Sequence, residues 1–327
     1  MQYSPDYDGT QHYSPRFLEY IDALINHLVH DIGIRRQTVL EIGCGQGEFL
    51  ERLCQQGNCR GIGIDPSCSP RQLEGQMMPT VSYLRDCYGP QHAKLDADFI
   101  CCRHTLEHIP ATREFLRMIR TSLGSRLNTL LFFEVPDTYR ILTEHAFWDM
   151  YYEHCSYFTM ASLARLFIES GFAIEEIRRD FDDQYLCILA RPSRNLTSNT
   201  TTWNQDVDEL GQRVDTFQQV HQDRIEHWQI QLKQMSATGK RVVLWGASSK
   251  SVAFLTALED SADIDCVVDI NPHKYGKYLP GTGLEIVSPD ALAEHRPDTI
   301  ILMNSIYRDE VKLELQEQNI ASELVAL

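Results

Sequence analysis

Short apolar runs alternate with amphipathic helical patterns along the first half of the chain. The runs are TVLEIG, RGIGID, VSYLRD, ADFICC and TLLFFEV, and helical patterns such as GEFLERLCQQG and EFLRMIRTSL lie between them. Strands that alternate with helices predict a parallel sheet covered by helices. Later, FAIEEIRRDF and YLCILARP are separated only by Asp-Asp-Gln, which predicts an antiparallel hairpin at the end of that sheet. The pattern therefore predicts an α/β fold.

The polar stretch SRNLTSNTTT, residues 193–202, is the best domain boundary in the chain. A long amphipathic helix is predicted after it, from about Trp203 to Met235, with one apolar side formed by Val207, Leu210, Val214, Phe217, Ile225, Trp228 and Leu232. From Lys240 a second series of strand-like and helical patterns begins, which predicts a smaller α/β domain. The expected division is an N-terminal segment 1–30 that covers the substrate, a domain 31–192, a linker and helix 193–238, and a C-terminal domain 239–327.

Composition and charge narrow the classes of function. The chain has 30 basic and 46 acidic residues, a net charge of −16, which argues against binding to nucleic acid or to a membrane surface. Its ten cysteines form no C-x-x-C pair, and neither a signal peptide nor an apolar run of membrane-spanning length is present. We therefore expect a reduced, cytoplasmic protein that is a monomer or a homodimer.

The strongest local signal is VLEIGCGQG, residues 39–47, in which a predicted strand runs into Gly43, Gly45 and Gly47 before a helix. Glycines there allow a sharp turn and a close approach of the backbone to a ligand. Asp65 ends the next strand, where a carboxylate can accept both hydroxyls of a ribose. The spacing G-x-G-x-G differs from the dinucleotide pattern G-x-G-x-x-G, and an acid, Glu41, precedes it.

This pattern resembles the first motif of class I methyltransferases that use S-adenosylmethionine. The resemblance implies a Rossmann-like sheet with an antiparallel terminal hairpin, and S-adenosylmethionine as cofactor. It places Asp86, at the end of VSYLRD, where the family holds the adenine amino group, and it places RHTLEH, residues 103–108, beside the methionine part. The implied cofactor-binding residues are Glu41, Gly43, Gly45, Gly47, Asp65, Asp86 and His104.

The stretch HTLEH, residues 104–108, also has the H-x-x-E-H form of an inverted zinc-protease motif. That motif needs both histidines one turn apart on a helix. Here the stretch follows a strand, and Pro110 suggests that a helix starts only afterwards. We therefore expect no metal site.

The stretch MYYEHCSYF, residues 150–158, is too polar for a core strand and too aromatic for an ordinary surface loop. Together with EVP at 134–136, it resembles the C-methyltransferases that act on nucleotide-linked 4-keto-deoxysugars. The resemblance assigns catalytic roles to Tyr151 and His154, and it adds His108 and Tyr13 to the pocket. Glu153, between the first two, is an expected substrate-binding residue.

These residue types suit methylation of a carbon beside a ketone. Histidine has an ordinary pKa near 6.5, which suits a general base at neutral pH, and a tyrosine hydroxyl can donate to an oxygen on which charge develops. We expect His154 to be the base and Tyr151 its oxyanion partner or proton shuttle. A structural pairing of His154 with Glu153 or Glu144 is the alternative.

The C-terminal sequence resembles the C-terminal domain of the same family in GASSK, VDINPHK and GKYLPG. Lys250 follows a glycine turn at a predicted helix start, where a phosphate could bind, and Lys274 and Lys277 are the other candidate phosphate ligands. Solvated turn lysines are the alternative interpretation of Lys274 and Lys277.

The sequence departs from that family in one respect, since it has no counterpart of the cysteine-rich zinc module with which the family's members begin. The absence removes part of the wall that the family builds around its substrate. We expect a small-molecule acceptor, either a nucleotide sugar, with a partner protein supplying the wall, or a related carbonyl compound. An O-methyltransferase acting on another hydroxyl compound, and a non-catalytic protein that binds S-adenosylmethionine or a sugar nucleotide, remain alternatives.

Overall fold

The computed structural model describes residues 11–68, 78, 80–194, 207–258 and 263–327. Internal contacts divide the described chain into two compact units, each built around its own sheet. The first unit contains Tyr20–Arg140 and Glu153–Leu210, and the second contains 11–19, Ile141–Tyr152 and Gly211–Leu327.

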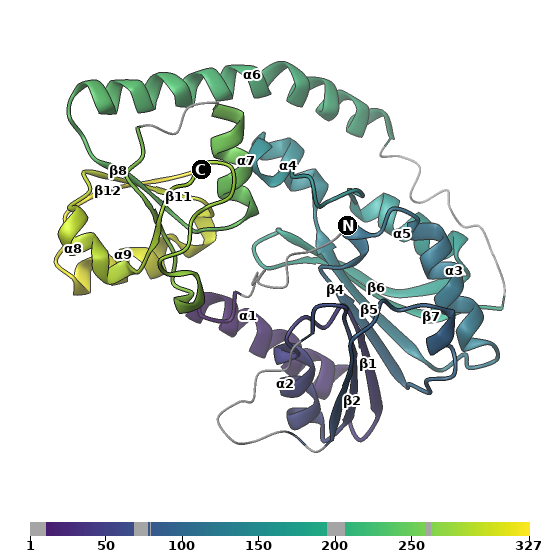
Figure 1. Ribbon diagram of the computed structural model, residues 1–327. Helices are drawn as coiled ribbons and strands as arrows, with labels where there is room; N and C mark the ends of the chain where they lie inside the picture. The colour runs from purple at the N-terminus through teal and green to yellow at the C-terminus, as the bar shows by residue number, and fades with distance from the viewer. Residues whose placement is uncertain (1–10, 69–77, 79, 195–206, 259–262) are drawn as a thin grey trace. The chain divides into compact units, whose positions relative to one another are not determined.

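Seven strands among the described residues form the sheet of the first unit, in the order β3-β2-β1-β4-β5-β7-β6 (Figure 1). They are β1 (Thr38–Ile42), β2 (Arg60–Ile64), β3 (Val81–Leu84), β4 (Phe99–Arg103), β5 (Leu130–Pro136), β6 (Phe172–Asp180) and β7 (Tyr185–Pro192). Neighbouring strands are parallel, except that β7 runs antiparallel to both β5 and β6. The predicted parallel sheet with an antiparallel hairpin is confirmed.

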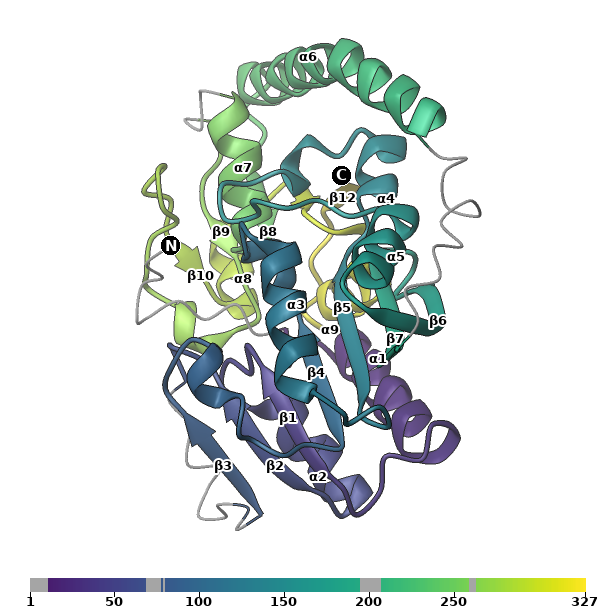
Figure 2. The same cartoon turned by 90° about the vertical axis from the view of Figure 1, so that its right-hand side faces the viewer.

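The helices of the N-terminal part of the chain are α1 (Pro15–Asn26), α2 (Glu48–Gly57), α3 (Thr112–Leu123), α4 (Thr138–Glu144) and α5 (Met160–Glu169). Helices α3 and α5 cover one face of the large sheet, where Leu116 and Phe167 pack in one apolar core with Phe133 of β5 (Figure 2). The residues of β4 and nearly all those of β5 are buried, because helices lie on both faces of a parallel sheet. The carboxyl ends of β1 to β5 meet at one edge, so the loops that follow them converge.

The second unit contains a smaller parallel sheet. Its described strands are β8 (Val242–Trp245), β9 (Val267–Val268), β10 (Ile286–Val287), β11 (Thr299–Leu302) and β12 (Glu323–Ala326), in the order β10-β9-β8-β11-β12. The helices of this part of the chain are α6 (Val207–Ala237), α7 (Ser249–Leu258), α8 (Leu292–His295) and α9 (Arg308–Glu317). The predicted second α/β domain is confirmed.

Helix α6 uses only part of its predicted apolar side. Ile225, Trp228 and Leu232 are buried, whereas Val207 and Val214 are 55% and 47% exposed. The described helix begins at Val207 and ends at Ala237; residues 203–206 of the prediction lie outside the described residues. None of the described helices is long and apolar enough to cross a membrane.

The segment Ile141–Tyr152 belongs to the second unit, whereas the sequence predicted one continuous domain from 31 to 192. The ring of Phe147 stacks on Phe254 of α7 with centroids 6.0 Å apart, and both side chains share a core with Trp228. Aromatic burial therefore groups this segment with the C-terminal sheet. Periodicity alone does not show which core an aromatic residue enters.

Candidate active site

The three glycines after β1 have different structural roles. Gly43 and Gly47 have φ of +74° and +87°, and a Cβ atom would lie 1.9 Å from Thr105 Oγ1 at Gly43 and 2.1 Å from the Tyr83 hydroxyl at Gly47. Gly45 has φ of +53°, and no described atom lies within 4 Å of where its Cβ would be. The outer glycines are therefore required by packing, while the backbone at Gly45 faces open space in which a ligand can approach closely.

Two carboxylates lie at the same edge, just after β2 and β3. Asp65 accepts hydrogen bonds from the Gly45 amide at 3.0 Å and from the Ser67 amide and hydroxyl at 2.7 and 2.6 Å. Asp86 is exposed and accepts from Gln91 at 3.0 Å and from the Cys87 amide at 2.8 Å, and these hydrogen bonds lower the pKa of Asp86. Both predicted acids therefore stand at strand ends beside the glycine loop, where their carboxylates accept hydrogen bonds.

Glu41 lies inside β1, only 2% exposed, and its Oε2 has no hydrogen-bond partner among the described residues. Burial raises the pKa of Glu41 to about 8, although the charge of Arg103 opposes this effect. The side chain is thus largely neutral at pH 7. It lies in β1 two residues before Gly43, with one carboxyl oxygen that has no hydrogen-bond partner among the described residues.

A group of buried charges occupies the ends of β4 and β5. Glu134 is fully buried, and its Oε1 lies 2.8 Å from Arg103 Nη2 and 2.7 Å from His104 Nε2; the hydroxyl of Tyr20 also donates to this carboxylate. Burial would raise the pKa of Glu134, but Arg103 and His104 together hold it well below its ordinary value. Burial would likewise lower the pKa of His104, but the neighbouring carboxylates, Glu134 foremost, raise it to about 9. His104 is consequently an imidazolium at neutral pH.

The turn after β4 is hydrogen-bonded to the segment that follows Tyr152. The Cys155 and Ser156 amides both donate to the Glu107 carbonyl at 3.0 Å, and His108 Nδ1 donates to the Glu153 carbonyl at 2.8 Å. The rings of His108 and His154 consequently lie edge to face with centroids 4.8 Å apart. Two predicted catalytic residues, 46 positions apart in the sequence (154 − 108), are thus brought together beside the glycine loop's edge of the sheet.

Glu107, His108 and His154 form a close cluster, in which one potential ligand atom of each lies within 4.8 Å of the others. This group differs from the H-x-x-E-H motif, which would use His104 and His108 on one helix. In the described structure Leu106–His108 is a short 3₁₀ turn, and His104 is paired with Glu134.

The other predicted site residues lie in the second unit. Tyr13 and Tyr151 are half-buried, and the ring of Tyr13 is 6.1 Å from that of His273. Lys250 Nζ lies 2.5 Å from Asp149 Oδ1, and Lys274 Nζ donates to the Ala247 carbonyl at 2.8 Å and to Asp269 at 3.0 Å. A phosphate would have to compete with these carboxylates for either lysine.

Lys277 is exposed. Glu153, by contrast, belongs to the first unit, where its carbonyl accepts from His108.

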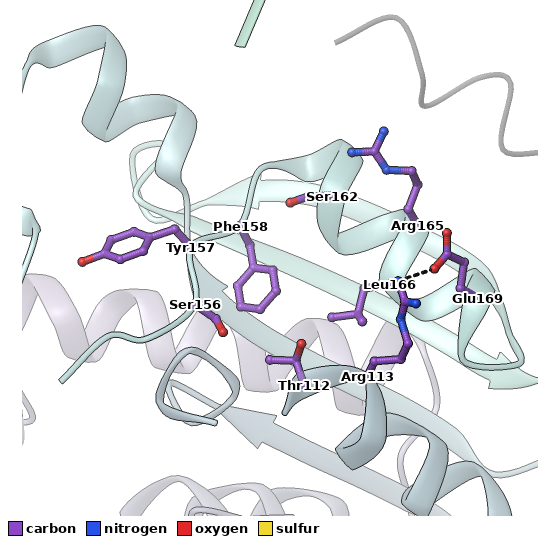
Figure 3. Close-up of a pocket in the computed structure, with 9 residues that line it drawn as sticks. All are labelled: Thr112, Arg113, Ser156, Tyr157, Phe158, Ser162, Arg165, Leu166 and Glu169. Carbon is purple, nitrogen blue, oxygen red and sulfur yellow. Dashed lines mark ion pairs between the residues drawn. The ribbon is translucent and has the colours of Figure 1, made fainter. Parts of the chain in front are cut away.

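A separate pocket of about 320 Å³ lies between the start of α3 and one side of α5, against Ser156–Phe158 (Figure 3). Arg113 and Glu169 form an ion pair of 2.7 Å at its rim. The pocket contains neither the glycine loop nor His154, so it is distinct from the predicted site.

Sequence reasoning missed several polar residues of the site: Tyr20, Arg103, Glu107 and Glu134. A signal was present for two of them, because Glu134 stands inside the apolar run TLLFFEV and Arg103 directly follows ADFICC. A charge in a buried strand must be paired, so each indicates the other. Nothing in the sequence indicated that Glu107 would be buried.

Comparison with known proteins identifies the chain's family. A profile described as "Methyltransferase domain" matches residues 12–177, half of the chain, and one described as "C-methyltransferase C-terminal domain" matches residues 203–323. The chain belongs to the methyltransferase family. A similar protein is C-methyltransferase NovU of Streptomyces niveus, 26% identical over 310 residues, which cover 90% of this methyltransferase and 73% of NovU.

Solved structures with similar folds are also methyltransferases. One is magnesium protoporphyrin IX methyltransferase (ChlM) from Synechocystis PCC 6803 with bound SAH, 17% identical with a TM-score of 0.42, covering 58% of this chain and 91% of the other. Another is 1,6-didemethyltoxoflavin-N1-methyltransferase of Burkholderia thailandensis, 18% identical with a TM-score of 0.40, covering 59% of this chain and 92% of the other.

The cofactor of this methyltransferase is S-adenosylmethionine, and the observed residues fit it. Gly45 leaves open space over the backbone, Asp65 presents a carboxylate at a strand end, and Glu41 Oε2 is a buried acceptor without a partner among the described residues. Such a set can take a ribose and a polar group of the methionine part.

Proposed function

We propose that this methyltransferase transfers a methyl group to a carbon beside a ketone, in a nucleotide-linked keto-deoxysugar. The similarity to NovU, named as a C-methyltransferase, and the match of residues 203–323 to a C-methyltransferase C-terminal domain support transfer to carbon. The observation that carries the proposal is the edge-to-face contact between the rings of His154 and His108. The loop that contains His154 is hydrogen-bonded to the turn after β4. A protein that only binds its ligand would not need such a pair.

In this proposal His154 removes the proton from the carbon beside the ketone. The pair of electrons stays on the substrate as an enolate, and the proton rests on the imidazole until water takes it. Tyr151 donates a hydrogen bond to the enolate oxygen, with Tyr13 completing the pocket. When bound, S-adenosylmethionine would supply an electrophilic methyl group. The residues that would hold the cofactor at this edge of the sheet are Gly43, Gly45, Gly47, Asp65, Asp86, Glu41 and His104.

The tautomer of His108 supports its role in the pocket. A carbonyl oxygen only accepts, so His108 Nδ1 carries the hydrogen that binds Glu153, and a neutral ring leaves a lone pair on Nε2. That nitrogen can accept a hydrogen bond from a sugar hydroxyl. Glu153 is proposed to bind the sugar, and Lys250, Lys274 and Lys277 to bind the diphosphate.

The test is incubation of the full chain with trideuteromethyl S-adenosylmethionine and a panel of 4-keto-deoxysugar nucleotides, followed by mass analysis of the products. A labelled product whose fragments carry the methyl on a ring carbon is the expected result. Label on an oxygen would make the protein an O-methyltransferase. No label, with cofactor binding confirmed in the same sample, would contradict the proposed acceptor class.

A further inference from the structure

A row of alternating charges leads from the core of the first unit to His154. Arg103 and His104 both contact Glu134, at 2.8 and 2.7 Å, and His104 Nδ1 lies 3.7 Å from Glu107 Oε1. Since His104 is an imidazolium at neutral pH, two cations (Arg103, His104) alternate with two carboxylates (Glu134, Glu107). Glu107 is the end of this row, next to the two catalytic histidines.

Glu107 is buried in an unusual way. The residue is only 1% exposed, yet neither carboxylate oxygen has a hydrogen-bond partner among the described residues. Burying a carboxylate without hydrogen bonds costs free energy, so such a group is kept where its charge acts on a neighbour. Its longer contact with His104 leaves the negative charge less fully compensated than that of Glu134, which has closer cationic partners.

The backbone of the same residue fixes the loop that carries His154. The Glu107 carbonyl accepts from the amides of Cys155 and Ser156, both at 3.0 Å. The position of His154 relative to the Glu107 carboxylate is thus fixed by adjacent hydrogen bonds rather than by a long flexible connection. A carboxylate within 4.8 Å of an imidazole favours the protonated ring.

We propose that Glu107 is a positioning residue for the reaction: its charge stabilises His154 after the ring has accepted the substrate proton. This inference rests on the proposed role of His154 as base. Glu107 itself exchanges no proton with the substrate. The two electrons of the broken C–H bond remain on the substrate, and the imidazolium that forms faces the Glu107 carboxylate until it releases the proton to water.

Other groups of the first unit also lie near His154. The ring faces His108 at 4.8 Å and Tyr157 at 6.1 Å between centroids, and Glu153 and Cys155 flank it in the sequence. Glu153 is half-buried, so water screens its charge more than that of Glu107. Removal of the Glu107 charge is therefore expected to have the larger effect on the pKa of His154.

The experiment is an NMR titration of His154 in the full chain, with the resonance assigned by its loss in His154→Gln. In Glu107→Gln the pKa of His154 is expected to fall by roughly one to three, since a close opposite charge favours the charged ring by about that amount. Glu107→Asp should keep most of the wild-type value. Glu114→Gln, an equal loss of charge at an exposed position of α3, should leave it unchanged.

Kinetics on the acceptor that becomes labelled in the methyl-transfer assay give a second readout. Because His154 acts unprotonated, the acid limb of kcat in Glu107→Gln should move to lower pH while the KM for the cofactor stays the same, and the plateau should drop about tenfold or more for the weaker base. If the glutamine variant is unfolded, Glu107→Met removes the charge without adding an unpaired polar group.

An unchanged His154 titration in a folded Glu107→Gln or Glu107→Met variant would overturn the proposal. So would tight zinc binding to the wild-type chain that is lost in these variants, because the cluster would then be a metal centre. The titration needs no substrate, so its outcome is independent of whether the acceptor is a keto sugar.

Discussion

His108 donates from Nδ1 to the carbonyl oxygen of Glu153 at 2.8 Å, and this contact joins two segments that the sequence places far apart. Together with the amides of Cys155 and Ser156 on the Glu107 carbonyl, it fixes the loop of His154 on the turn after β4. The close approach of His108 and His154 therefore depends on main-chain geometry as much as on side-chain contacts.

Replacement of His108 tests this connection. His108→Asn keeps a donor near the Nδ1 position and should preserve the loop, whereas His108→Leu leaves the Glu153 carbonyl unpaired. Loss of such a bond costs about 1–3 kcal/mol, so the amides of Cys155 and Ser156 should exchange roughly 10- to 100-fold faster in the leucine variant. Hydrogen exchange measures this, and equal protection in both variants would contradict the connection.

The glycines of the loop after β1 give a matched series. Gly45 and Gly124 share a φ of +53° and open space, so alanine should destabilise the fold at either position, and more at Gly124, whose ψ of −116° lies outside the left-handed helical region. Only Gly45→Ala should weaken binding of S-adenosylmethionine, as measured by calorimetry. Gly43→Ala should destabilise the fold far more, because its Cβ would lie 1.9 Å from Thr105 Oγ1. Equal cofactor affinity in Gly45→Ala and Gly124→Ala would rule out the proposed approach at Gly45.

Glu41 should make the fold less stable as the pH rises. The folded chain keeps this proton up to about pH 8, whereas an unfolded glutamate loses it near 4.5, so the folded state binds more protons between these values. The free energy of unfolding should fall in this window by about 1.4 kcal/mol per pH unit from this group. Urea unfolding of the cofactor-free chain measures it.

Glu41→Gln should remove that contribution, and the exposed Glu114→Gln should not. Parallel pH profiles for the wild type and Glu41→Gln would show that Glu41 is ionised in the folded chain.

Substitutions of the buried ion pair Arg103 and Glu134 should have strongly non-additive effects on the free energy of unfolding. Arg103→Met keeps an apolar side chain over the Phe49 ring, 4.2 Å from the present guanidinium, but removes one cation from a fully buried carboxylate. Loss of one partner of a buried ion pair lowers the free energy of unfolding by about 3–5 kcal/mol. Adding Glu134→Gln to Arg103→Met should restore part of that stability. Additive effects in chemical unfolding would argue against the pairing.

Much of the first unit could be predicted from the sequence. Alternating strands and helices predicted the parallel sheet, and strand ends share one edge, so Asp65, Asp86 and the glycines were expected together. The side to which Phe147 packs could not be predicted, because an apolar residue shows that it is buried but not against what. The same reason explains why Val207 and Val214 of α6 are exposed on a helix whose later apolar positions are covered.

The side-chain network of the site was harder to predict than the motifs. The sequence singled out His108 and His154 through a family resemblance. The pairing of His104 with Glu134, by contrast, accompanies a φ of +47° at His104 and the parallel pairing of β4 with β5, neither of which a local pattern shows. Burial of Glu107 depends on a loop that follows it by nearly fifty positions. Such long-range contacts are set by the fold and not by local pattern.

The central claim is that His154 removes a proton from the carbon beside a ketone, and solvent exchange tests it most directly. The keto-sugar nucleotide that becomes labelled in the methyl-transfer assay is incubated in deuterium oxide with the protein and S-adenosylhomocysteine, which cannot donate a methyl group. The wild type should introduce deuterium at the carbon that is otherwise methylated, and His154→Gln, with cofactor binding intact, should reduce the rate by 100-fold or more, as expected for loss of a general base. Equal exchange rates in the two proteins would contradict the account.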